Sequence, residues 1–483
     1  MPFDGVSLVV ISAAAGLIAL AWRRGGVSRG ALGALLLATL LIRLDPAWQR
    51  SLHPWDEQYH ALVAKNLLVD PLQPTLYRDP AIDYDYTDWT ANHVWLHKPP
   101  LALWWMAGSM KLFGVDAVAM RVPSILAATA SVLLTFLIGR VLLDVRVGLL
   151  AATFHAVNGF VVALASGRRV ADHVDTALLF FFELSIYAAI LSARRGRSGL
   201  IIVSGVAIGC GLLSKSLSAL IALPVIAVMV GSERGWSQAV RAVITAAACA
   251  LLVAAPWNWY AMSQFPREFA WENLHVLRHV TERLEEAPAS RFSYFMDMPR
   301  FFGESIVVSL VLASIWVARR DAAVALRALC AWAAIPYVTF SLASTRMPGY
   351  VMVAAPALFL IQAYVWWRLA DGWSGVHGPR RLAAMTLLAL MVTLPARYLL
   401  EPTGVFERRD RWQVQGLRDL ERRAGPGEVV VFNVPNPFEV MFYSPYTAYS
   451  GLPTEDQLRR LSAAGRRVVI LDGEQPARQD APN

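Results

Sequence analysis

Asp56 and Glu57 form an acidic pair in the stretch HPWDEQYHALVAKNLL (53–68), which is unusually polar for this chain. A carboxylate placed there could act as a general base that deprotonates a hydroxyl group for attack on an activated carbon. The same stretch predicts a short amphipathic surface helix after Pro54, and Asp56 could simply cap that helix. Glu57 could hold an acceptor, bind a metal ion together with His60, or face water as a first-turn carboxylate.

Lys98 is a candidate for contacting an anion. It lies in VWLHKPPLALWWMAGSMKLFG (94–114), directly before Pro99 and Pro100, and it is one of only four lysines among the 44 basic residues. The two prolines keep the backbone extended ahead of a Trp-rich interfacial helix, so we expect the Lys98 ammonium group to point along a bilayer surface, where lipid phosphates lie. The alternative is a lysine that snorkels beside aromatic anchors.

Arg346 and Lys215 each stand at a break between two apolar segments. In ASTRMPGYVMVAAPAL (343–358), Pro348 is an early residue of a predicted helix, and the positive end of that helix would help Arg346 to bind a phosphate. The stretch LLSKSLSALIALP (212–224) repeats this arrangement around Lys215. Both residues are therefore candidates for a phosphate site.

Asp172 and Asp175 precede a very apolar span in SGRRVADHVDTALLFFFELSIYA (166–188). Helix capping explains Asp172. Asp175 would lie in the first turn of the helix, where a carboxylate at the membrane edge needs a partner such as an arginine, a metal ion or the substrate.

Glu272, His275 and His279 fall on one face of the helix predicted for WENLHVLRH (271–279). This spacing could bind a divalent cation, and it also fits an interfacial histidine pair whose hydrogen bonds are satisfied within the protein. The sequence requires no cofactor, and a divalent metal ion, with His60 as a further candidate ligand, stays an open alternative.

The chain that carries these residues is predicted to be an α-helical polytopic membrane protein. Hydrophobic residues make up 56% of its 483 residues, charged residues make up 17%, and the mean hydropathy is +0.44, which exceeds the norm for soluble proteins. The net charge of +8 comes from arginines between apolar segments, so we expect no nucleic-acid partner. The first apolar run follows Asp4 rather than a basic region and is interpreted as a retained anchor.

The apolar runs predict about twelve transmembrane spans, several of them shorter than a full span needs. They lie near residues 6–22, 30–45, 121–140, 147–165, 174–192, 199–214, 217–231, 242–256, 304–318, 322–343, 350–369 and 382–398.

Arginine placement predicts the orientation, because positive residues in short loops mark the cytoplasmic side. By this rule the outward segments are 46–120, 166–173, 214–217, 257–303, 344–349 and the tail from about 400. All of the candidate residues named above lie in these segments or at their edges. We therefore expect one site on the outer face of a membrane.

The tail is predicted to be a separate domain. Residues 429–434 and 466–472 have the composition of strands, and 454–465 predicts a helix that Thr454 caps. The sequence thus divides into a transmembrane domain, 1–399, whose first outer loop (46–120) is expected to be catalytic, and a small extracytoplasmic α/β domain, 400–483.

Taken in order along the chain, these motifs resemble a known superfamily. The acidic pair is followed by Lys-Pro-Pro-Leu, Leu-Phe-Gly, Arg-Val-Pro-Ser (121–124), Asp175 before a Phe-rich span, Lys215 in a Leu-rich turn, Pro256-Trp257 and Arg-Met-Pro-Gly-Tyr (346–350). The set is similar to the protein O-mannosyltransferase and aminoarabinose (lipid A) transferase superfamily, and it covers roughly residues 45–400. The resemblance implies the GT-C fold of membrane glycosyltransferases.

The resemblance also implies a polyprenyl-phosphate-linked sugar as the donor and transfer at the outer face, with inversion. By motif, Asp56 corresponds to the catalytic or acceptor-positioning carboxylate and Lys98 to the lysine that contacts the lipid phosphate. Aminoarabinose transferases carry Asp-Glu-x-Arg-Tyr, whereas Tyr59 and His60 stand at the last two positions here. Tyr59 therefore takes the place of a phosphate-binding cation.

The expected mechanism is a single displacement in which Asp56 accepts the acceptor's proton, while Lys98, with Arg346 or Lys215, stabilises the departing lipid phosphate. The expected acceptor is a lipid A-like glycolipid, a polysaccharide or a protein hydroxyl, and the expected setting is a monomer in a bacterial inner membrane with its site facing the periplasm or the exterior. The competing interpretation is a transporter or flippase for a lipid-linked or anionic substrate, which many spans and intramembrane charges also suit. A receptor or scaffold that displays the tail would leave the loop residues unexplained.

Overall fold

A computed structural model describes residues 29–53, 55–168, 173–284, 290–320, 323–370, 378–397 and 411–471. The chain forms two compact units, each described here by itself. Unit 1 falls within Met1–Trp48, Pro123–Ala261 and Asn273–Glu407, and unit 2 falls within Gln49–Val122, Met262–Glu272 and Arg408–Asn483.

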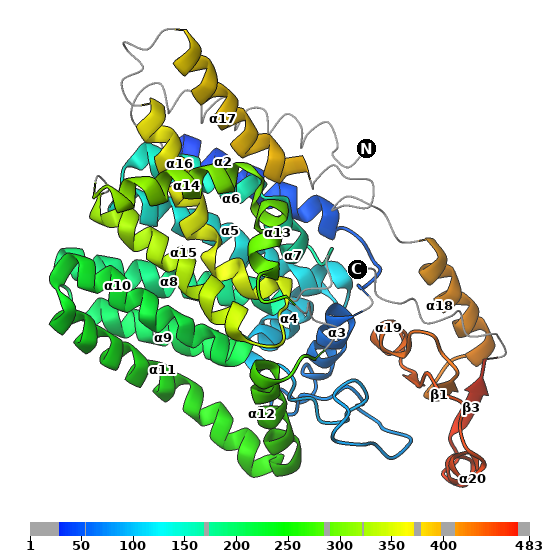
Figure 1. The fold of residues 1–483 in the computed structure, drawn as a ribbon. Coiled ribbons are helices and arrows are strands. Elements are labelled where there is room, and N and C mark those ends of the chain that lie inside the picture. The colour runs from blue at the N-terminus through cyan, green and yellow to red at the C-terminus, as the bar shows by residue number, and fades with distance from the viewer. Residues whose placement is uncertain are drawn as a thin grey trace. The chain divides into compact units, whose positions relative to one another are not determined.

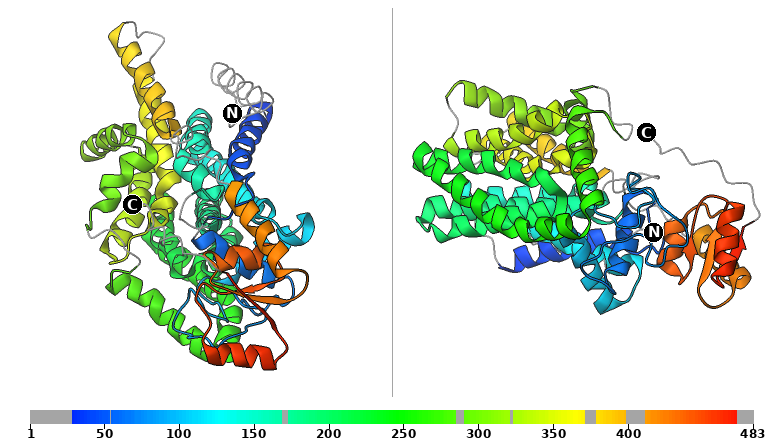
Figure 2. Two further views of the ribbon diagram at one scale, coloured as in Figure 1. Left: turned by 90° about the vertical axis from the view of Figure 1, so that its right-hand side faces the viewer. Right: turned by 90° about the horizontal axis from the view of Figure 1, so that it is seen from below.

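Unit 1 is a bundle of apolar helices that lie side by side (Figures 1 and 2). The described residues of the predicted apolar segments from 30–45 onward fall largely on its helices, which confirms the helical class. Its elements are α2 (Arg29–Ala47), α5 (Ala117–Leu142), α6 (Val145–Val157), α7 (Gly159–Ala165), α8 (His173–Arg195), α9 (Gly199–Lys215), η1 (Ser216–Ile221), α10 (Ala222–Arg234), α11 (Trp236–Gln264), α13 (Ser293–Phe302), α14 (Ser305–Ala318), α15 (Val324–Leu342), η2 (Pro348–Ala354), α16 (Ala355–Ala370) and α17 (Pro379–Ala396); α5, α11 and α12 (Pro266–Thr281) cross the division between the units.

The membrane-spanning character is clear, whereas the expected number of spans stays unconfirmed. Among the described residues, seven helices are long and apolar enough to cross a membrane, and the number rises to nine if each of two bent pairs is one span. The pairs are α6 with α7, bent by 59°, and α13 with α14, bent by 114°. The first predicted span, 6–22, lies outside the described residues.

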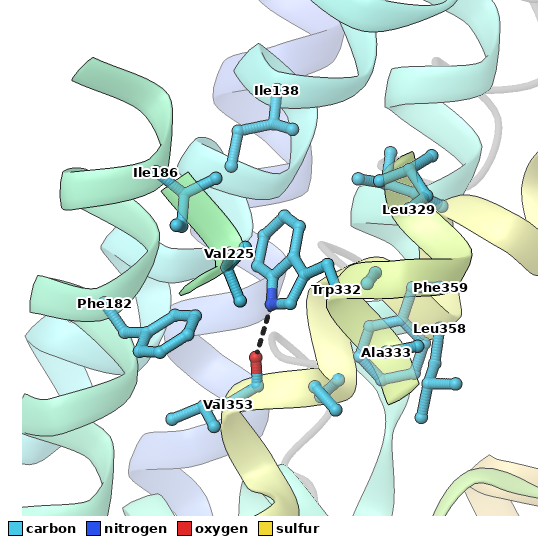
Figure 3. Packing of buried hydrophobic residues seen from close by; sticks show 14 of the residues in the cluster. Ile138, Phe182, Ile186, Val225, Leu329, Trp332, Ala333, Val353, Leu358 and Phe359 are labelled. Atoms are coloured by element: carbon cyan, nitrogen blue, oxygen red, sulfur yellow. Dashed lines mark hydrogen bonds between the residues drawn. The ribbon is translucent and has the colours of Figure 1, made fainter. Parts of the chain in front are cut away.

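Large side chains fill the centre of unit 1, and small residues let its helices approach closely. The Trp332 indole is fully buried and donates a hydrogen bond of 3.0 Å to the Val353 carbonyl, among aliphatic and aromatic side chains from several helices (Figure 3). A Cβ on Gly205 of α9 would lie 2.6 Å from the Ala246 carbonyl oxygen of α11. Such contacts are the usual basis of helix packing in membranes.

The chain turns sharply between α9 and α10, at the break that the sequence placed around Lys215. Ser216 has a φ of 52°, a left-handed conformation that ends a helix. Ala219 consequently packs back against Gly211 of α9. The turn leaves Lys215 at the end of α9, where its side chain is only partly buried.

Unit 2 combines the first outer loop with the C-terminal region. Its sheet has the order β2-β1-β3 with parallel pairing, and Val430 lies opposite Thr447 and Val468. The helix α20 contacts β3 (Figure 2, red), and Thr454 caps it with a capping box. The elements are α3 (Asp56–Asn66), α4 (Pro100–Phe113), α18 (Arg411–Ala424), β1 (Val429–Phe432), α19 (Pro437–Tyr443), β2 (Thr447–Ala448), α20 (Glu455–Ala463) and β3 (Arg467–Ile470).

The predicted strands and helix of the tail are confirmed, and α19 and β2 are additions that the sequence did not predict. The expected boundary between residues 399 and 400 lies outside the described residues, so the two-domain division stays a prediction. The compact units join the tail to the first outer loop.

Candidate functional site

Asp56 is the first residue of α3 and is half-buried. Trp55 occupies the N-cap position and makes no side-chain capping bond, so Asp56 is a first-turn residue rather than the cap. The predicted helix is confirmed, but its amphipathic character is wrong. Nearly all of its residues are buried, because α4 and α19 pack against it.

Glu57 is fully engaged inside unit 2. Its Oε1 accepts from Arg121 Nε at 2.6 Å, and its Oε2 accepts from Arg121 Nη2 at 2.8 Å and from the His53 backbone N–H at 2.6 Å. Both partners of the ion pair are at most 4% exposed. Such a bidentate pair fixes geometry strongly, and this favours a positioning role for Glu57 over contact with substrate.

Arg121 also holds the backbone that leads to Asp56. Its Nη1 donates to the Gln49 carbonyl at 2.6 Å, and its Nη2 donates to the Ser51 carbonyl at 2.8 Å. The guanidinium therefore ties the irregular segment of residues 49–53, the approach segment, to the Glu57 carboxylate. The sequence showed Arg121 within a motif, but no local pattern indicated this contact.

Trp89 joins the stretch that carries Asp56 to the stretch that carries Lys98. Its ring meets Trp55 edge-on with centroids 6.1 Å apart, and it stacks on His97 at 4.2 Å. Trp55 and His97 directly precede Asp56 and Lys98 in the chain. The structure thus brings both stretches to one buried ring.

Lys98 lies just before α4 and is half-buried. Pro99 is extended, with a ψ of 156°, and Pro100 begins the helix, as the sequence predicted. Lys98 thus precedes the start of α4, and the positive end of a helix favours an anion.

Tyr59 and His60 are buried in the aromatic core of unit 2. The Tyr59 ring lies 4.5 Å from Phe438 and 5.2 Å from Trp89, and the His60 ring lies 5.6 Å from Trp95. Burial, with the Asp56 charge adding to it, raises the pKa of Tyr59 and keeps the phenol neutral. The predicted phosphate contact of Tyr59 stays a prediction, and its packing favours a role in holding α3.

The predicted metal ligands occupy separate surroundings. Glu272 Oε2 lies 3.3 Å from His97 Nδ1, and the His275 and His279 rings meet edge-on at 4.8 Å. In the described part of the chain, no three His, Cys, Asp or Glu side chains are grouped so as to hold a metal ion. A bound divalent ion therefore stays a prediction, and the proposed mechanism does not include one.

Asp175 and Lys215 form an ion pair in unit 1. The Lys215 ammonium contacts the Asp175 carboxylate and lies 5.1 Å from the centroid of the Tyr350 ring. Gly349 packs against the same carboxylate, and a Cβ there would clash with it. The partner that Asp175 needs is thus a lysine. The predicted contact of Lys215 with a phosphate stays a prediction.

Arg346 belongs to the same cluster and is only 4% exposed. Pro348 begins η2, which continues into α16, as the sequence predicted. The Tyr294 hydroxyl donates to the Met347 carbonyl at 2.9 Å, and Arg346 and Asp175 are charged groups near this hydroxyl. Asp172, the other predicted carboxylate, lies outside the described residues.

A polar cleft of about 510 Å³ opens in unit 2 between loop 80–84 and α20. Asp83 and Arg460 pair there at 3.3 Å, and Tyr84 packs on His93 with ring centroids 4.0 Å apart. Burial lowers the pKa of His93 to about 4, so its imidazole is neutral at pH 7. An exposed aromatic ring among neutral and charged hydrogen-bonding groups suits the surface of a sugar.

Three residues from outside the predicted set link α19 to the approach segment and to α3, which carries Asp56. Glu439 and Tyr443 reach the approach segment from α19, and Lys65 reaches α19 from α3. The scarcity of lysine could have drawn attention to Lys65. No pattern in the sequence indicated the contact of Glu439, because its partner Leu52 is 387 positions away.

Comparison with known proteins agrees with this architecture. A family model described as dolichyl-phosphate-mannose-protein mannosyltransferase matches residues 97–260. An undecaprenyl phosphate-alpha-4-amino-4-deoxy-L-arabinose arabinosyl transferase of Pseudomonas fluorescens is 27% identical over 406 residues, which cover 79% of this chain and 66% of that protein. A relative of the same description from Pseudomonas aeruginosa is 27% identical over 350 residues, or 68% of this chain and 58% of that protein. The chain thus spans less than two thirds of the length of these relatives.

Solved structures share the fold at low sequence identity. ArnT from Cupriavidus metallidurans in the apo state has a TM-score of 0.65 at 15% identity, covering 91% of this chain and 89% of that chain. The oligosaccharyltransferase of Archaeoglobus fulgidus has a TM-score of 0.57 at 13% identity, with coverages of 89% and 65%. These likenesses agree with the resemblance that the ordered motifs indicate, and the chain shares the GT-C fold of the membrane glycosyltransferases to which it is similar.

Proposed function

We propose that the chain transfers a sugar from a polyprenyl-phosphate-linked donor to a hydroxyl group of an acceptor, at the outer face of a bacterial inner membrane and with inversion. The convergence of the Asp56 and Lys98 stretches on Trp89 carries the proposal, because it places a carboxylate and a cation in one unit. An ArnT structure bound to undecaprenyl phosphate supports a donor of this class. The chain would act as a monomer among membrane lipids, without nucleic acid.

Asp56 is proposed as the general base of a single displacement. Its carboxylate accepts the proton of the acceptor hydroxyl as that oxygen forms a bond to the anomeric carbon of the donor. The bond from the anomeric carbon to the phosphate oxygen breaks, and its electron pair leaves with the polyprenyl phosphate. A base fixed in place contributes about 100- to 10,000-fold to the rate of such a step.

Lys98 is proposed to stabilise the departing phosphate. The negative charge on the phosphate grows as the glycosidic bond breaks, and the Lys98 charge, together with the positive end of α4, favours that change. Polyprenyl phosphate is already a fair leaving group, so this electrostatic help can replace a strong general acid. Lys215 and Arg346 keep their predicted anion-binding roles as proposals for unit 1.

The polar cleft is proposed to hold the glycan part of the acceptor. Asp83, Tyr84, His93 and Arg460 offer hydrogen-bonding groups of both polarities around an aromatic ring. This composition favours a glycolipid or polysaccharide acceptor over an apolar one, because each buried sugar hydroxyl needs a partner.

The test is turnover and donor binding measured on the same variant. In membranes containing the native acceptor, Asp56→Ala should lower the release of polyprenyl phosphate from labelled donor by at least about 100-fold, while the purified variant binds the donor as wild type does. Glu421→Gln, an exposed change on α18, serves as the control. Loss of donor binding together with turnover would show that Asp56 is structural. Donor crossing the membrane without release of polyprenyl phosphate would favour the transporter.

A further inference from the structure

Each of the five residues of the approach segment 49–53 has a backbone N–H or carbonyl group that is hydrogen-bonded to a side chain of unit 2. Arg121 binds the carbonyls of Gln49 and Ser51, and Glu57 binds the His53 N–H. The two remaining contacts come from the C-terminal region. The Leu52 N–H donates to Glu439 Oε1 at 3.2 Å, and the Tyr443 hydroxyl donates to the Arg50 carbonyl.

Glu439 and Tyr443 both belong to α19. Glu439 is 4% exposed, and its second oxygen accepts from Asn436 Nδ2 at 3.0 Å, which fixes the orientation of the carboxyl group. Asn436 also caps the start of α19. The Glu439 carboxyl group that accepts from the Leu52 N–H is therefore held in one orientation at the start of α19.

The far end of α3 is fastened to the same helix. Lys65 Nζ donates to the carbonyls of Met441, Phe442 and Ser444 at 2.7, 3.0 and 3.1 Å. These oxygens lie at the end of α19, where a helix leaves carbonyls unpaired and carries its negative pole. Between the two ends, the Tyr59 and Phe438 rings lie 4.5 Å apart, so α3 is bound to α19 along its length.

Two charged groups and two neutral polar groups lie near the Glu439 carboxyl group. Glu57 faces it from α3 and Arg121 from α5, and Asn436 and Tyr443 face it from its own segment. Burial raises the pKa of Glu439 to about 7, with the Glu57 charge adding to the effect. A group with these neighbours is coupled directly to the ion pair that holds the approach segment.

From these contacts we infer that α19 is the element that positions Asp56, with Glu439 as its main positioning residue and Tyr443 as the second. The C-terminal region would then be part of the catalytic machinery without touching substrate. This inference rests on the proposed function of Asp56, and it gives the tail a role beyond covering the site or binding the acceptor.

Hydrogen exchange of the purified full chain tests the placement without relying on activity. In Glu439→Ala, amides in a peptide that includes Leu52 and His53 should exchange at least 10-fold faster than in wild type, because one of the bonds that hold this segment is lost. Exchange within α20 should be unchanged, and this serves as the internal control for folding. If the α20 amides also exchange faster, Tyr443→Phe decides, because it removes one hydroxyl and leaves the ring; unchanged exchange of 49–53 in that variant would overturn the inference.

Turnover tests the functional half of the inference. Glu439→Ala should lower kcat by at least 10-fold with donor affinity unchanged, and Glu439→Gln should recover most of the rate, because its amide oxygen can still accept from the Leu52 N–H. A kcat for Glu439→Ala equal to that of wild type would overturn the positioning role, even with the exchange result confirmed. If wild type itself releases no polyprenyl phosphate, the proposed function fails, and the exchange experiment still decides whether α19 holds the segment.

Discussion

Two buried ion pairs, one in each unit, hold the candidate residues in different ways. In unit 2, Arg121 is 2% exposed and directs its N–H groups at Glu57 and at two backbone carbonyls. In unit 1, Lys215 is 12% exposed, contacts Asp175 and rests near the Tyr350 ring. The first pair fixes a segment of irregular backbone, and the second joins elements of a helix bundle.

The difference follows from the surroundings of each pair. Irregular backbone in unit 2 has unpaired carbonyl groups, so a guanidinium with several donors can satisfy them and order the segment. In unit 1 the Lys215 ammonium instead meets the Asp175 carboxylate and lies near the Tyr350 ring. We therefore expect the Glu57–Arg121 pair to fix the backbone geometry of the approach segment in unit 2. We expect the Asp175–Lys215 pair to set the local charge in unit 1.

Breaking the pair in unit 2 should have the largest effect. Arg121→Ala leaves the Glu57 carboxylate buried without its cation and releases two carbonyls, at a cost of about 3–5 kcal/mol. We expect a clear fall in the thermal midpoint in detergent and loss of turnover. Arg121→Lys keeps the charge but not the bidentate geometry, so its turnover should also be lost while its midpoint recovers in part. Wild-type turnover in Arg121→Lys would contradict the geometric role.

Breaking the pair in unit 1 should cost less. Asp175→Asn leaves Lys215 with partial access to solvent and with the Tyr350 ring, so we expect a loss of about 1–3 kcal/mol. The double variant Asp175→Asn with Lys215→Met removes both charges and should regain part of that stability. Thermal unfolding of the two variants measures this, and a double variant less stable than the single one would contradict the account.

The pH dependence of stability sharpens the comparison, and we expect its effect to be of intermediate size. The pKa of Glu439 is raised from its ordinary value of 4.5 to about 7, so the folded protein binds more protons than the unfolded chain between these values. The stabilising contribution is complete below about pH 4.5 and is lost as the pH rises through 7. The wild-type midpoint should thus fall, relative to Glu439→Gln, between pH 5 and 8. Parallel curves for the two proteins would refute the raised pKa.

Breaking an exposed ion pair should have the smallest effect on stability, and it serves as a reference for the two buried pairs. Asp83 and Arg460 are 94% and 64% exposed, and such pairs contribute little to stability. Arg460→Ala should leave the thermal midpoint unchanged, and it should raise KM for the acceptor by about 10-fold through the loss of one charged hydrogen bond. An unchanged KM would remove the cleft from the acceptor site.

Sequence patterns predicted those features that depend on local chemistry. Apolar runs predicted the helices of unit 1, and the capping residue Thr454 predicted the start of α20. The extended backbone at Pro99 followed from the two prolines. Each of these depends on neighbours in the chain, so a single sequence carries the information.

The remaining features depend on contacts between distant segments. The sequence left Glu57 open as an acceptor-holding residue, a metal ligand or a first-turn carboxylate that faces water, because its partner Arg121 lies 64 positions away. No sequence pattern indicated that Lys215 pairs with Asp175, because the carboxylate lies on another helix. The amphipathic interpretation of α3 was wrong for the same reason: α19, which covers it, comes from the end of the chain.

The measurement that tests the central claim most directly is mass spectrometry of the lipids that co-purify with the protein in mild detergent. Wild type should carry polyprenyl phosphate or its glycosylated form, and Lys98→Ala should carry much less, because the cation proposed to bind the phosphate is gone. The mass of the glycosylated form would also identify the sugar. Absence of polyprenyl lipid from wild type, together with failure of added polyprenyl phosphate to bind, would contradict the account and favour a transporter.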